Sequence, residues 1–168
     1  RNIPDTYKIK NYIHHTQPRS AAVVGGGYIG VEMAENLKQA GLQVTIIEMA
    51  NQVIAPLDYD MASDVHRHIE NQGVNLILGN AVRSVTENEN GLHIALNSGT
   101  IDAEMLIMSI GIRPETAIAK NAGIPVNKNG FIITNESMLT NDPDIYAVGD
   151  AVEVTDFVTK QKVTVPLA

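Results

Sequence analysis

The stretch that decides the fold is "VVGGGYIGVEMAE", residues 23–35. A short apolar run meets three consecutive glycines, and a helical pattern follows at once. Gly25, Gly27 and Gly30 have the spacing G-x-G-x-x-G. In that motif the first glycine allows a tight turn, the second lets a pyrophosphate approach the backbone, and the third lets helix and strand pack closely. The stretch therefore predicts a strand–turn–helix that binds phosphate at the helix N-terminus.

The segments around this turn predict a strand–helix–strand unit. The expected elements are strands at 21–24 and 42–48 and a helix over 28–40. Ile29, Met33 and Leu37 recur at every fourth position, which is typical of one apolar face of a helix. Gly26 occupies a variable position of the motif, and the pattern gives it no role beyond the turn.

The chain then repeats the alternation once and departs from it. A second helix is expected from Asp58 or Asp60 to Gln72 and a third strand at 74–78, and the helix has the apolar series Met61, Val65 and Ile69. Residues 81–102 lack a helical period, and the turn signals Asn90-Gly91 and Ser98-Gly99 predict an antiparallel meander there. An apolar strand follows at 104–110. The fold class is therefore α/β, a Rossmann-like three-layer domain with a parallel sheet and a β-meander crossover.

Composition excludes several classes of function. The 168 residues carry a formal net charge of −7, which argues against binding to nucleic acid or to an anionic membrane. Apolar runs fall short of the roughly 20 residues of a membrane span. Without cysteine the chain has no disulfide and no thiolate nucleophile, which is compatible with a reducing cytoplasm. His66 and His68 are expected as solvated helix residues, His14 and His15 in a loop, and no metal site is predicted.

Glu48 ends the second expected strand. A carboxylate at this point can accept hydrogen bonds from the ribose hydroxyls of an adenosine and would repel a 2′-phosphate. The residues that follow it, MANQ, contain no Arg or Lys that could neutralise such a phosphate. The sequence therefore predicts NAD(H) rather than NADP(H).

Several segments together resemble the pyridine nucleotide–disulfide oxidoreductase family. They are GGGYIGVEMAE, the acid-terminated second strand, the β-meander, SIGIRPET and TNDPDIYAVGDA. The segments MASDVHRHIENQGVNLILG and TVPLA are most similar to the branch of coenzyme A-disulfide reductases, NADH oxidases and NADH peroxidases. Family members are flavoproteins with two dinucleotide-binding domains.

The resemblance implies roles for individual residues. The NAD-binding set would be Gly25, Gly27, Tyr28, Ile29, Gly30, Glu48 and Gly111. Tyr28 matches a lid tyrosine that covers the flavin, or it only shields the start of the helix. Glu32 matches a glutamate near the nicotinamide and flavin, or it is only a solvated acid. Gly149 and Asp150 match the motif that binds the ribityl chain of FAD, or they form an ordinary turn.

The resemblance also implies a domain division and an activity. Residues 1–18 would be a lead-in segment, 19–110 the NAD-binding domain, and 111–168 the incomplete start of a second FAD-domain segment. The full-length protein would be a cytoplasmic, homodimeric enzyme of redox homeostasis. It would pass hydride from NADH to FAD, and on to a disulfide, persulfide, peroxide or oxygen acceptor. The alternatives are a non-catalytic NAD-sensing module and a ferredoxin-reductase-type flavoenzyme. The isolated piece is not expected to turn over.

Overall fold

The computed structural model describes residues 2–89 and 91–165, which fold into two compact units. The first unit extends to Gly111, and the second begins at Ile112. Asn90, which was expected to form a hairpin turn with Gly91, lies outside the described residues. So do the last three residues of the segment TVPLA.

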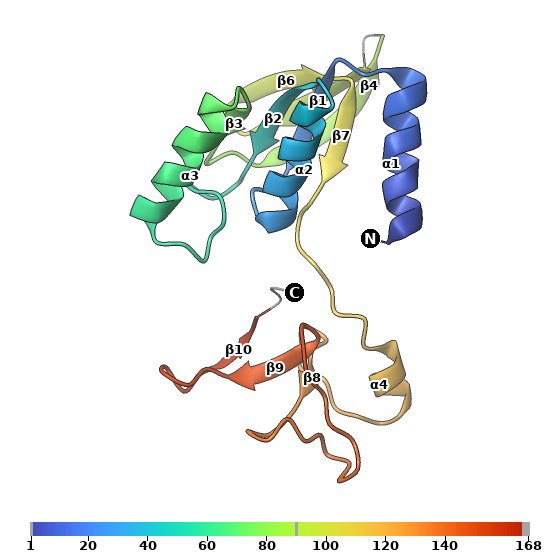
Figure 1. Ribbon diagram of the computed structural model, residues 1–168, viewed down its shortest axis with the longest axis vertical. Helices are drawn as coiled ribbons and strands as arrows, with labels where there is room; N and C mark the ends of the chain where they lie inside the picture. Colours follow the sequence, from blue (N-terminus) through green and yellow to red (C-terminus); the bar gives the residue numbers. More distant parts are fainter. Residues whose placement is uncertain (1, 90, 166–168) are drawn as a thin grey trace. The chain divides into compact units, whose positions relative to one another are not determined.

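A parallel sheet of four strands forms the centre of the first unit (Figure 1). Its strands lie in the spatial order β3 (Asn75–Ile77), β2 (Gln43–Ile47), β1 (Ser20–Val24) and β7 (Met105–Met108). Val23 of β1 lies opposite Ile46 on one side and Ile107 on the other. The crossovers from β1 to β2 and from β2 to β3 contain the helices α2 (Tyr28–Gln39) and α3 (Tyr59–Asn71). The predicted Rossmann-like alternation is confirmed.

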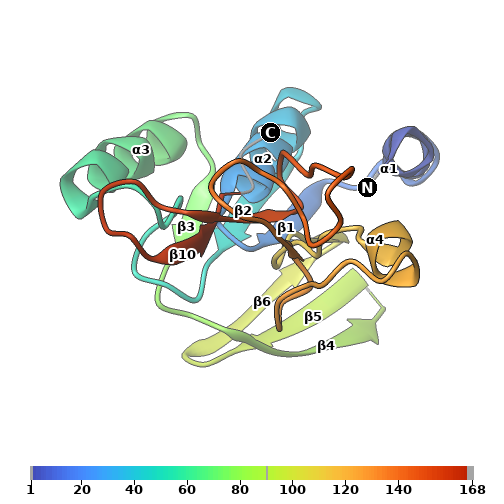
Figure 2. The same cartoon turned by 90° about the horizontal axis from the view of Figure 1, so that it is seen from below.

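The meander predicted for residues 81–102 is also present. It consists of the antiparallel strands β4 (Val82–Asn88), β5 (Gly91–Leu96) and β6 (Gly99–Ala103). It connects β3 to β7 and covers the face of the parallel sheet opposite to α2 and α3 (Figure 2). The first unit therefore has the three layers that the sequence predicted.

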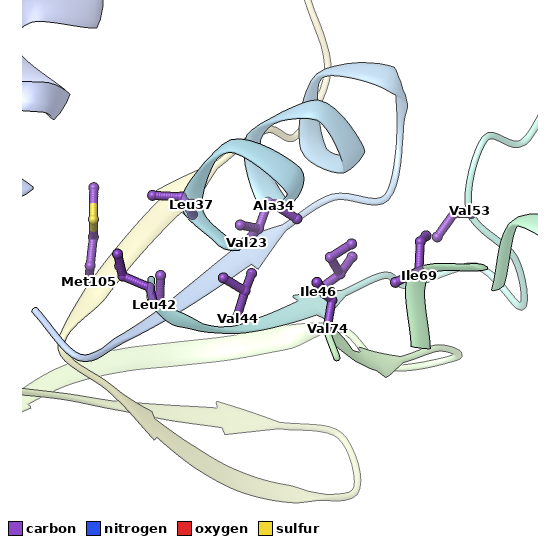
Figure 3. Packing of buried hydrophobic residues seen from close by; sticks show 11 residues of the cluster. Val23, Ala34, Leu37, Leu42, Val44, Ile46, Val53, Ile69, Val74 and Met105 are labelled. Carbon is purple, nitrogen blue, oxygen red and sulfur yellow. The ribbon is translucent and has the colours of Figure 1, made fainter. Parts of the chain in front are cut away.

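Alternate residues of β1 enter two separate hydrophobic cores. Ala21 and Val23 belong to the cluster beneath the helices, together with Leu37 of α2 (Figure 3). Ala22 and Val24 belong to the cluster beneath the meander. Full burial of a Val or Leu side chain stabilises a fold by about 1.5–3 kcal/mol, so both faces hold β1 in place. The glycine turn that follows β1 thus starts from a rigid strand end.

The segment expected as a lead-in contains the helix α1 (Ile3–Thr16). Oδ1 of Asn2 accepts a hydrogen bond from the Asp5 amide at 3.0 Å, and the Asp5 carboxylate accepts one from the Asn2 amide at 3.2 Å. This reciprocal cap starts the helix. His14 and His15 lie in its last turn, so their expected place in a loop is wrong.

The buried faces of α2 and α3 were predicted in part, because Leu37 and Ile69 are buried as expected whereas the first residue of each expected series is exposed. In α2 the buried residues are Gly30, Ala34 and Leu37, whereas the Ile29 side chain is 41% exposed. In α3 the buried residues are Ala62 and Ile69, and the Met61 side chain is 58% exposed. Small residues share these buried faces with Leu37 and Ile69, and they let the helices lie close to the sheet. The series of large apolar residues therefore found Leu37 and Ile69 but missed the small buried residues Gly30, Ala34 and Ala62.

The second unit contains the helix α4 (Ala117–Asn121) and a small sheet in the order β10 (Lys162–Thr164), β9 (Val152–Thr155) and β8 (Ile132–Ile133). The segment DIYAVGDA, residues 144–151, has the apolar composition of a strand. It forms only an isolated bridge between Tyr146 and Leu139. Tyr146 and Val148 are exposed there, so the apolar composition of the segment does not reflect burial within this unit.

Candidate nucleotide-binding site

A cleft of 580 Å³ lies in the first unit where β1, β2 and β7 end. Parallel strands present their carboxyl ends at one edge of a sheet, and open α/β sheets bind ligands at that edge. The walls of this cleft come from segments that are far apart in the sequence. They are residues 24–27, 47–49, 52, 54–55, 80–82 and 108–111.

Two motif glycines are required by the protein's own packing. Gly25 has a φ of +105°, and a Cβ added to it would lie 2.7 Å from the carbonyl oxygen of Ser109. A Cβ at Gly30 would lie 1.8 Å from the carbonyl oxygen of Gly25. A side chain at Gly30 would therefore push the helix off the turn. These two positions account for the tight turn and the close helix–strand packing of the motif.

Gly27 differs from both, because the space around it is open. Within the described part of the chain, no heavy atom other than those of Gly27 and its two chain neighbours lies within 4 Å of a Cβ built on Gly27. Gly27 is also the N-cap of α2, so it leaves the first amides of the helix without a side-chain cap. Free amides and the positive end of the helix dipole favour an anion at this point. The backbone therefore fits the close approach of a pyrophosphate.

The Glu48 carboxylate is held beside this turn by two backbone amides. Gly26 donates to Oε2 at 2.6 Å, and Ala50 donates to Oε1 at 2.8 Å. An ionised carboxylate has about four acceptor positions, so two remain for hydroxyl groups of a ligand. Glu48 also lines the cleft. The predicted phosphate turn and the predicted ribose acceptor thus meet at one site.

The structure gives Gly26 the role that the motif did not. Its amide binds Glu48, and its carbonyl oxygen accepts a hydrogen bond from the Ile54 amide at 2.8 Å. A Cβ on Gly26 would lie 2.9 Å from Cγ1 of Val53 and 3.2 Å from Cβ of Glu48. Gly26 therefore connects the turn to Glu48 and to the loop after β2. The glycine between the two motif glycines Gly25 and Gly27 was the only signal of this in the sequence.

Ser109 was missed because serine at a strand end carries no motif. Its hydroxyl donates to the carbonyl oxygens of Val24 at 2.8 Å and of Gly25 at 3.0 Å. Its amide donates to the Val24 carbonyl oxygen at 2.8 Å. Ser109 thereby joins the end of β7 to the first residues of the glycine turn.

Four other residues predicted for the nucleotide site lie in the first unit. Gly111 lines the cleft and has a φ of +75°, which favours glycine. Tyr28 and Ile29 form the first turn of α2, where the Tyr28 side chain is 46% exposed. Glu32 is exposed further along the same helix.

Gly149 and Asp150 belong to the second unit. Gly149 has a φ of +93°, and its carbonyl oxygen accepts a hydrogen bond from the Val152 amide at 3.3 Å. These two residues therefore form a tight turn that leads into β9.

The histidines of α3 are not equivalent. Nε2 of His66 accepts a hydrogen bond from the Val53 amide at 3.1 Å, and its side chain is half-buried. The expectation of a merely solvated residue is therefore wrong for His66, although His68 is exposed. Across residues 2–89 and 91–165, no three His, Asp or Glu side chains gather in a way that could hold a metal ion.

Comparison with known proteins places the chain in a family. The family model described as pyridine nucleotide-disulphide oxidoreductase matches residues 2–165. The chain belongs to this family. A curated relative is the NADH oxidase of Methanocaldococcus jannaschii, with 41% identity over 167 residues, or 99% of this chain and 37% of the relative.

Two solved structures of this family have the same fold. Reduced CoADR-RHD of Bacillus anthracis is 50% identical, with a TM-score of 0.89 over 99% of this chain and 30% of that one. The water-forming NADH oxidase of Lactobacillus brevis bound to NADH is 31% identical, with a TM-score of 0.86 over 99% of this chain and 37% of that one. The chain therefore spans about a third of the length of these family members. Their names belong to the branch that the resemblance indicated. In the described part, no helix is long and apolar enough to cross a membrane.

Proposed function

We propose that the first unit binds NAD(H), with the pyrophosphate at Gly27 and the N-terminus of α2 and the adenosine ribose at Glu48. The observation that carries this proposal is the hydrogen bond between the Gly26 amide and the Glu48 carboxylate. It brings the phosphate turn and the ribose acceptor together at one cleft. The relative bound to NADH supports the same cofactor for this chain.

NAD(H) is favoured over NADP(H) by charge. A 2′-phosphate would stand beside the ionised Glu48 side chain, and like charges at contact distance repel. The residues that line the cleft include no Arg or Lys that could offset this repulsion within the described part of the chain. Glu48 is thus the residue that we propose selects the cofactor.

The whole protein is proposed to be a flavoprotein oxidoreductase. Bound NADH would supply a hydride to FAD, and the roles of this chain are to bind, orient and exclude water. Tyr28 is proposed as the aromatic side chain between the two cofactors, and Glu32 as a neighbour of the nicotinamide. Gly149 and Asp150 of the second unit are proposed to contact the ribityl chain of FAD.

The electron acceptor is proposed to be a disulfide, persulfide, peroxide or oxygen. The names of the relatives include NADH oxidase, coenzyme A disulfide reductase and coenzyme A polysulfide/persulfide reductase, which support this range. We further propose that the full-length protein is a cytoplasmic homodimer that serves redox homeostasis.

The proposal is tested on the purified full-length protein. We expect a yellow, flavin-containing preparation whose visible band is bleached by NADH without oxygen, and more slowly by NADPH. A colourless protein that binds NADH without any redox change would instead support the NAD-sensing module.

A further inference from the structure

The loop between β2 and α3 forms one wall of the nucleotide cleft. Gln52, Ile54 and Ala55 of this loop line the cleft. Val53 points the other way: its side chain is fully buried and belongs to the core beneath the helices, near Ile69 of α3 (Figure 3). Successive residues of this loop face the cleft and the core in turn. The loop can do this only if its backbone is held in one conformation.

Two successive amides of the loop are held from opposite sides. The Ile54 amide donates to the carbonyl oxygen of Gly26 at 2.8 Å, which ties the loop to the glycine turn. The Val53 amide donates to Nε2 of His66 at 3.1 Å, which ties it to α3. The Gly26 amide in turn holds Glu48. A chain of contacts thus runs from α3 through the loop to the residue that would bind the ribose.

His66 suits this role chemically. Nε2 can accept a hydrogen bond only when it carries no proton, so the neutral ring keeps its proton on Nδ1. The ring lies edge-to-face with Tyr59, with 6.4 Å between centroids. Without His66, the Val53 amide would lose its side-chain acceptor beside a fully buried residue. Leaving such a donor unpaired is unfavourable.

We propose that His66 is a positioning residue of the nucleotide site. It holds Val53, and thereby the loop, against Gly26 and Glu48, so that the ribose-binding carboxylate is in place before the cofactor arrives. This inference rests on the proposed NAD(H) function. It assigns His66 no contact with the cofactor.

The test compares three variants of the full-length protein. His66→Leu removes the acceptor, His66→Gln keeps one, and His68→Leu changes the exposed histidine of the same helix. Binding is measured by titration with NAD⁺, because NAD⁺ does not reduce oxidised flavin. We expect the Kd of His66→Leu to rise roughly threefold to tenfold, the range that follows from the loss of one hydrogen bond. His66→Gln should recover most of the affinity, and His68→Leu should bind like the wild type.

Two further readouts separate positioning from general damage. With saturating NADH the kcat of His66→Leu should stay at the wild-type value while its KM rises. Hydrogen exchange at the Val53 amide should be slow in the wild type before any nucleotide is added, and faster in His66→Leu. Fast exchange of this amide in the wild type would overturn the inference even if His66→Leu failed to fold.

The failures of the two proposals can be told apart. If the wild type binds NAD⁺ and His66→Leu binds it equally well, the role of His66 is wrong and the proposed function stands. If the wild type does not bind NAD⁺ at all, the proposed function itself is wrong.

Discussion

The backbone amide of Gly26 donates a 2.6 Å hydrogen bond to Oε2 of Glu48 and so joins the glycine turn to the end of the second strand. The amide of Ala50 holds the other carboxylate oxygen. Because both donors are backbone groups, the carboxylate is oriented by the fold itself. A side chain that is oriented before binding loses less entropy when a ligand arrives.

Exchanging the charge at Glu48 should change which cofactor binds. We predict that Glu48→Arg weakens NADH binding by about tenfold or more, since it removes charge-assisted hydrogen bonds to the ribose. It should also strengthen NADPH binding, so that the preference is flattened or reversed. Calorimetric titration of both nucleotides measures this. Glu35→Arg makes the same change of charge on an exposed residue of α2 and should leave the preference as it is. Equal affinities for both nucleotides in the wild type would contradict the ribose argument.

Gly26→Ala should destabilise the fold before any cofactor is added. The new methyl group would lie 2.9 Å from Cγ1 of Val53, a side chain that is fully buried and has little room to move. Overpacking of this kind lowers the free energy of unfolding by about 1–3 kcal/mol. Denaturant unfolding of the chain without nucleotide measures the loss. An unchanged midpoint would mean that Val53 and the loop do not pack against Gly26 as described.

Gly27→Ala should leave the fold stable but weaken the binding of NAD⁺. Its methyl group would enter open space, and the backbone at φ −72° and ψ −178° accepts any residue. The free energy of unfolding should therefore change by no more than about 0.5 kcal/mol. NAD⁺ affinity should fall by about tenfold or more, because the methyl group stands where the pyrophosphate approaches. Gly26→Ala and Gly27→Ala serve as controls for each other. If Gly27→Ala lost stability without losing affinity, Gly27 would not be the position where the pyrophosphate approaches.

Arg19 and Glu104 make one part of the stability depend on pH. The backbone amide of Arg19 and then its guanidinium bind the Glu104 carboxylate, and these bonds hold the pKa of Glu104 below its ordinary value. The stabilisation is therefore complete above the unfolded-state pKa of about 4.3 and is lost as the pH falls through the lower, folded-state pKa. We predict that Glu104→Gln lowers the Tm at neutral pH and that the two Tm curves converge in acid. Parallel curves down to the lowest pH would contradict this.

The layered fold could be predicted because its signals are local. The glycine spacing, the acid at the end of β2 and the loss of helical period after β3 each lie within a short window. The buried helix faces could be predicted only in part: the apolar series found Leu37 and Ile69 but not the small residues beside them. Gly30 and Ala34 are buried because the helix lies close to the sheet, and small residues give a weak hydrophobic signal.

The support of the site could not be predicted from the sequence. Gly26, Val53 and His66 are separated by more than a dozen residues at each step, and they meet only when the loop folds back onto the glycine turn. A histidine in a helix gives no indication of which backbone amide will donate a hydrogen bond to it. Such contacts follow from tertiary packing, whereas the motif glycines follow from the backbone geometry of one turn.

The most direct test of the nucleotide site is a titration of the ¹⁵N-labelled chain with NAD⁺, followed amide by amide by NMR. We predict saturable shifts that are largest at Gly25–Gly30 and at Glu48–Ala50, with smaller shifts for an equal concentration of NADP⁺. Shifts that are absent from the glycine turn, or that are larger with NADP⁺, would contradict the central claim.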